Sequence, residues 1–165
     1  MDVHLLLVFT HIAGTILGVG GATIAEVQII KALKDGKVDD SEKALMHANY
    51  TIIRVGTFLV LLSGIALVWW WYFFGGSDWP LTSAKVWVKD IMILAIVINA
   101  WCLSKRYVPL WLGSAISFTS WWGATVLGTW RGIPYSFTEI FIGYLVAIVI
   151  MAGVLELIRK IALKR

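Results

Sequence analysis

Long apolar runs, each able to cross a lipid bilayer, divide this chain, and its charged residues gather in short stretches between them. Of the 165 residues, 59% are hydrophobic and only 15% are charged, which excludes an ordinary soluble domain. A transmembrane helix needs roughly 20 apolar residues. We therefore expect one all-α membrane domain over residues 1–165, a polytopic bundle of about five transmembrane helices. The predicted spans lie near residues 3–31, 47–74, 84–104, 110–130 and 136–159.

Basic residues are distributed unequally about these spans. The side that holds the first loop, the third loop and the carboxyl tail carries Lys31, Lys34, Lys37, Lys43, Lys105, Arg106, Arg159, Lys160, Lys164 and Arg165. The opposite side has only Arg131 in a loop. Because basic loops stay in the cytoplasm, the amino terminus is predicted outside and the carboxyl terminus in the cytoplasm. This bias explains the net charge of +4 without nucleic acid as a partner, and a prokaryotic plasma (inner) membrane is the expected location.

The first predicted helix carries its histidines and small residues on one face. Steps of three, four and seven residues return to the same side of a helix, and they connect His4, His11, Gly14, Gly18, Gly21 and Ala25. Glycine on such a face permits close packing of a second helix, or it leaves space for a flat ligand against the backbone. The sequence leaves both alternatives open.

A second polar face follows the third helix, again at steps of three and four residues, through Lys85, Lys89, Met92, Ile96 and Asn99. Lys85 lies at the outer boundary, where it can extend to the headgroups, whereas Lys89 is one turn deeper. Both helices descend from outside, so His11 and Lys89 are expected within roughly 5 Å of the same level. A shared site in the outer leaflet is therefore possible.

Charged and aromatic residues deeper in the spans gave two further expectations. Glu26 on the first helix and Arg54 on the second are predicted to form an ion pair, either as a structural lock or as a proton or propionate contact. Trp121 and Trp122 lie well inside the fourth helix, and we favour contact with lipid over contact with a flat ligand.

A neutral histidine beside glycines suits haem iron, because imidazole supplies an axial bond and glycine leaves room for the macrocycle. His11 is the preferred axial ligand of a b-type haem, with Gly14 and Gly18 beside the ring. Lys89, Met92, His4 or no residue at all would complete the opposite position.

Three stretches also resemble a known superfamily of small membrane proteins, which contains the haem-dependent bacterial protoporphyrinogen oxidase and the copper-resistance D proteins. They are HIAGTILGVGG (11–21), RVGTFLVLLSGIALVW (54–69) and AKVWVKDIMILAIVINAW (84–101). The resemblance implies that His11 and Lys89 are the functional pair, with Lys85 as the competing alignment. The oxidase family has an aromatic-Gly pair and an arginine on the first helix, where this chain has Gly20-Gly21 and Glu26. Haem binding therefore carries over more readily than porphyrinogen oxidation.

Three functions are consistent with these patterns. The first is a haem b membrane protein for electron transfer or for oxidation of a lipophilic or porphyrin-like substrate, with a quinone or another redox partner. The second is a transporter or channel-like protein, with copper as one candidate for the transported ion, whose pathway the two polar faces line. The third is a non-catalytic assembly subunit. A homodimer is also expected, since a few helices around a large cofactor leave apolar surface to cover.

Overall fold

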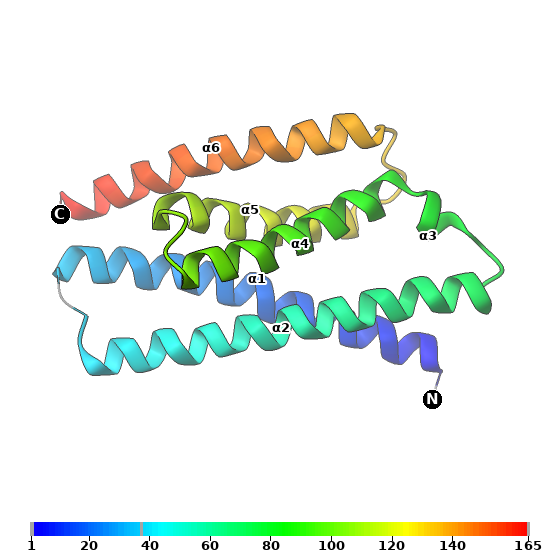
Figure 1. The fold of residues 1–165 in the computed structure, drawn as a ribbon, viewed down its shortest axis with the longest axis horizontal. Helices are drawn as coiled ribbons and strands as arrows, with labels where there is room; N and C mark the ends of the chain where they lie inside the picture. Colours follow the sequence, from blue (N-terminus) through cyan, green and yellow to red (C-terminus); the bar gives the residue numbers. More distant parts are fainter. Residues whose placement is uncertain (1, 37, 165) are drawn as a thin grey trace.

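The computed structural model describes residues 2–36 and 38–164, and this part of the chain is helical with no β-strand. Five long helices are present: α1 (Val3–Asp35), α2 (Asp40–Phe73), α4 (Ala84–Ser104), α5 (Leu110–Thr129) and α6 (Phe137–Leu163). A single turn, α3 (Trp79–Thr82), begins at a Trp-Pro pair in the connection between α2 and α4. The helices lie along one direction, and the two termini lie at opposite ends of the bundle (Figure 1).

Local sequence signals set the helix ends. Gly36 has a positive φ of 65°, which glycine adopts readily, and it ends α1. Asp39 and Glu42 then form a capping box at the start of α2, in which each side chain bonds the other residue's backbone N–H. Ser136 and Glu139 form the same motif at the start of α6. Because of the first motif, α2 begins at Asp40, well before the predicted residue 47.

The expected fold class, a helical membrane bundle, is confirmed. α1, α2, α4 and α6 are long and apolar enough to cross a membrane. α5 has 20 residues but contains many Ser, Thr and Gly residues and is not among the helices apolar enough by the same measure, so the predicted number of five spans stays a prediction. The direction of insertion stays a prediction, and Lys37 and Arg165, two of the basic residues behind it, lie outside the described residues.

The polar composition of α5 follows from its central place among α1, α4 and α6. Its hydroxyl and backbone groups find partners on neighbouring helices. The Ser120 hydroxyl lies 2.7 Å from the Tyr144 hydroxyl of α6. The Asn99 amide of α4 donates to the Gly113 carbonyl at 2.6 Å and to the Ser117 hydroxyl at 2.8 Å. In lipid, polar groups are tolerated where protein satisfies them.

Trp121 on α5 is only 1% exposed and fills the core between α1, α2 and α4 with Ala22, Val60 and Ile96. The expectation that it contacts lipid is therefore wrong, whereas its neighbour Trp122 is 43% exposed, as expected. Burial of Trp121 follows from the position of α5 inside the bundle. The indole ring thus belongs to the interior of the protein.

Glycines bring α1 and α2 into backbone contact. A Cβ on Gly14 would lie 2.8 Å from the Leu59 Cβ, and one on Gly56 would lie 2.8 Å from the Gly14 carbonyl oxygen. The Asn49 amide donates across the same seam to the Gly21 carbonyl at 3.0 Å. Close approach through small residues is a general means of packing helices in lipid. This pair of helices forms one wall of the bundle.

We predict that Gly56→Ala lowers the free energy of unfolding by about 1–3 kcal/mol, because the added methyl group forces α1 and α2 apart. The measurement is unfolding in mixed micelles, followed by circular dichroism. Gly20→Ala is the matched control, since nothing lies within 4 Å of its Cβ position. It should leave stability unchanged or raise it by up to about 1 kcal/mol. Equal effects of the two substitutions would contradict the close approach.

Candidate functional site

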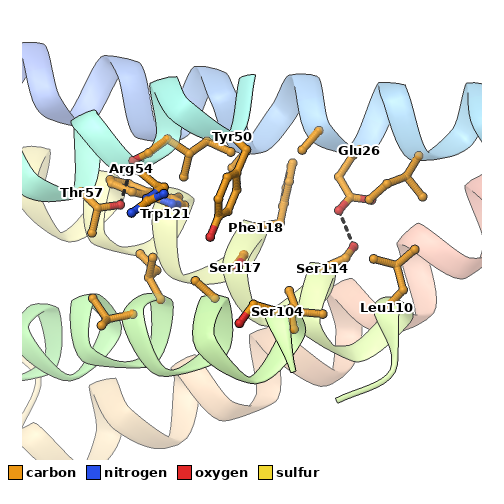
Figure 2. Close-up of a pocket in the computed structure, with 18 of the residues that line it drawn as sticks. Glu26, Tyr50, Arg54, Thr57, Ser104, Leu110, Ser114, Ser117, Phe118 and Trp121 are labelled. Carbon is orange, nitrogen blue, oxygen red and sulfur yellow. Dashed lines mark hydrogen bonds between the residues drawn. The ribbon is translucent and has the colours of Figure 1, made fainter. Parts of the chain in front are cut away.

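A cavity of about 580 Å³ lies between the α1–α2 pair and the α4–α5 pair. It extends from Ser104 and Leu110, at the end of the bundle predicted to face the cytoplasm, to Leu61 and Trp121 in the middle parts of α2 and α5. Most of its walls are aliphatic or aromatic. The polar lining consists of the hydroxyl residues Tyr50, Thr57, Ser104, Ser114 and Ser117 and the charged residues Glu26 and Arg54, most of them labelled in Figure 2.

Glu26 belongs to a buried cluster that joins three helices. Arg159 of α6 donates to the Glu26 carboxylate at 2.8 Å and to the Ser114 hydroxyl at 2.6 Å. The Ser114 hydroxyl in turn donates to the other Glu26 oxygen. Glu26 and Arg159 are 6% and 5% exposed. A buried carboxylate is tolerated only when it is paired and hydrogen-bonded, and this cluster meets both conditions.

Because Glu26 pairs with Arg159, the predicted Glu26–Arg54 ion pair is wrong. The Arg54 guanidinium lies instead over the Tyr50 ring, 5.6 Å from its centroid, and Figure 2 shows Arg54 and Glu26 well apart along the cavity. Because α2 begins at Asp40, Arg54 lies about 21 Å from that end. Glu26 lies only about 14 Å from the adjoining end of α1. The two residues are therefore at different depths.

Sequence reasoning missed Arg159 because it was assigned to the cytoplasmic tail. α6 continues to Leu163, so Arg159 is still helical. A signal was nevertheless present, since Leu155 and Arg159 are four residues apart and both are buried. An arginine that continues the inward face of a helix is a candidate for a buried ion pair.

A second group of polar residues surrounds His11, near the opposite end of the bundle. His11 Nδ1 lies 3.0 Å from the Ser63 hydroxyl oxygen, and that hydroxyl donates to the Leu59 carbonyl at 2.5 Å. Since the Ser63 proton is directed to Leu59, Ser63 accepts from an Nδ1–H group of His11. This tautomer leaves Nε2 with its lone pair, as in histidines that ligate metals or accept protons.

The glycine face of α1 does not fit a haem macrocycle. Leu59 and the Val60 backbone of α2 occupy the space at Gly14, and the six-membered ring of Trp121 occupies the space at Gly18. Gly14 and Gly18 are therefore covered by protein atoms. Of the two alternatives that the sequence left open, the structure shows close packing of a second helix. His11 fits an axial ligand by its free Nε2, but a flat group cannot lie against these glycines.

The other proposed ligands take different positions around His11. Lys89 is partly buried and interacts electrostatically with His11, which agrees with their predicted common level. Lys85 donates to the Trp130 carbonyl at 3.2 Å. The His4 ring lies 4.4 Å from the ring of Trp70, centroid to centroid. Met92 packs in the core with Tyr144 of α6 and other apolar residues.

No protein-family model matches this chain, and no curated protein and no solved structure is significantly similar to it. The resemblance read from residues 11–101 therefore stays a prediction. Function must be argued from the cavity, the Glu26 cluster and the surroundings of His11.

We predict that Arg159→Met lowers the free energy of unfolding by about 3–5 kcal/mol, because it leaves the Glu26 carboxylate buried without its cation. Adding Glu26→Gln should restore more than half of this loss, and unfolding of the single and double variants in mixed micelles measures the coupling. Arg54→Met is the control and should cost less than about 1 kcal/mol. A loss from Arg54→Met as large as that from Arg159→Met would contradict the observed pairing.

Proposed function

We propose that this integral membrane protein binds a lipid-soluble, porphyrin-like small molecule in the cavity between the α1–α2 and α4–α5 pairs. The observation that carries the proposal is the cavity itself, whose volume of about 580 Å³ is within the usual range of roughly 300–1,000 Å³ for small-molecule sites. Apolar walls with a few polar groups are typical of such sites. The location in a prokaryotic plasma membrane remains part of the proposal.

The chemistry of the walls favours a substrate or carried ligand over haem b at this position. No histidine, cysteine or methionine is among the described residues that line the cavity, so an axial imidazole or thiolate for iron is not at hand. A metal-free tetrapyrrole or a quinone requires no such ligand. Its flat ring would lie among aliphatic side chains and the aromatic rings of Phe118 and Trp121.

The test uses protoporphyrin IX dimethyl ester, a neutral flat probe, and the quenching of tryptophan fluorescence, since Trp121 lines the cavity. We predict saturable binding to the purified protein. Ala100→Phe should weaken it at least about tenfold, because the ring fills part of the space that the probe needs.

Val149→Phe is the matched control, because it adds the same kind of ring on the membrane-facing side of α6, where Val149 is 73% exposed. Binding to this variant should equal that of the unmodified protein. Identical quenching in all three proteins would mean that the probe dissolves in the detergent micelle, and the proposal would fail.

Haem-linked electron transfer is the second candidate, and the observation that favours it is the His11 tautomer with its free Nε2 beside Lys89. When bound, haem would supply one-electron redox chemistry. His11 would be the axial ligand and Ser63 would fix the imidazole by accepting from Nδ1–H. The macrocycle would have to lie away from Gly14 and Gly18, whose space protein atoms fill.

For this candidate we predict a Soret band and a reduced α-band in the protein purified after haem supplementation, recorded oxidised and after dithionite. His11→Ala should abolish both bands, because it removes the axial nitrogen. His47→Ala is the control, a histidine near the start of α2 that should leave the spectrum unchanged. A featureless spectrum would remove the haem candidate and would leave the cavity proposal standing.

A further inference from the structure

Arg54 is the uncompensated charge on the cavity wall. The other charged lining residue, Glu26, is neutralised by Arg159 at 2.8 Å. Among the described residues Arg54 forms no ion pair, and its guanidinium makes a cation–π contact with the Tyr50 ring. The wall therefore has a net positive charge, which is complementary to an acidic ligand.

Tyr50 and Arg54 provide donors side by side. They are four residues apart on one face of α2, and both line the cavity. Within the described part of the chain the Tyr50 ring contacts Arg54, and the Tyr50 hydroxyl has no hydrogen-bond partner. A guanidinium matches the two oxygens of a carboxylate in a planar fork, and a phenol adds a third donor. Together they form an anion subsite attached to an apolar cavity.

The cavity opens to the membrane between α2 and α4. Most of its exposed lining residues lie on these two helices, among them Arg54, Phe58 and Val97, whereas the lining residues Ala22 of α1 and Trp121 of α5 are buried. α2 and α4 pack closely on other helices and touch each other little. Arg54 thus lies at the mouth of the cavity, and Trp121 lies at its closed side.

We propose that the ligand of this cavity is a lipid-soluble carboxylic acid that enters between α2 and α4. Arg54 and Tyr50 hold its carboxylate at the mouth, and its apolar body extends toward Trp121. This inference rests on the proposed function, because it assumes that the cavity is a binding site. It adds the charge of the ligand, its orientation and the residue that selects it.

The test compares protoporphyrin IX, which has two carboxyl groups, with its neutral dimethyl ester in nanodiscs of phosphatidylcholine. The unmodified protein should prefer the acid at least about tenfold, the strength of one charge-assisted hydrogen-bonded pair. Arg54→Gln should remove this preference. Partitioning of the probes into lipid is the same for every variant, so comparing the acid-to-ester ratio of Arg54→Gln with that of the unmodified protein cancels it.

Lys105→Gln is the matched control, because Lys105 is an exposed cation at the end of α4 outside the cavity. It should keep the preference for the acid. If Arg54→Gln keeps it too, Arg54 does not select the ligand and this inference is overturned while ester binding still supports the cavity. Failure of both probes to exceed the Ala100→Phe background would instead overturn the proposed function.

Phospholipid is the competing source of an anion at Arg54. The binding measurements are therefore repeated in nanodiscs that contain phosphatidylglycerol. A retained acid preference supports the carboxylate assignment. If the preference disappears in these bilayers while ester binding stays unchanged, Arg54 binds the lipid headgroup, and the inference is overturned.

Discussion

The Glu26–Arg159 ion pair is the contact on which the half of the bundle that holds the carboxyl terminus depends. It joins α1 to α6, and through Ser114 it includes the central helix α5. In a medium of low dielectric constant neither charge is tolerated alone, so these helices must assemble in one arrangement. The pair also removes the negative charge from the cavity wall, and the character of the cavity is consequently set by Arg54.

Tight packing of α1, α2 and α5 determines where a ligand can bind. The glycines of α1 allow the α2 backbone and the Trp121 ring to come close, so the histidine-bearing face of α1 is occupied by protein below His11. Space remains instead between the α1–α2 and α4–α5 pairs, toward the end of α4 and the start of α5. The small residues that suggested a haem site therefore pack the helices together, and the space for a ligand lies elsewhere in the bundle.

Hydropathy predicted the span at residues 84–104 without error, because Ser83 and Lys105 bound its apolar run. It placed the start of α2 too late, because the Asp39–Glu42 capping box extends the helix through polar residues. The Glu26–Arg54 pair failed for the same reason, since a helix that starts earlier changes every depth measured from its end. Burial of Trp121 was not predictable from its own segment, because it depends on which helix becomes central.

His11 and the cavity are two separate sites along α1. At about 1.5 Å per residue, Glu26 lies about 22 Å from His11, and Trp121 packs against Gly18 between them. A ligand whose acid group is at Arg54 therefore cannot also place its ring on His11 Nε2. If both sites function, the molecule bound in the cavity and the group bound at His11 are different, and each can be removed without the other. The haem candidate is argued from His11 and Lys89, while the cavity is argued from Arg54 and Trp121, so the two sites can be tested separately.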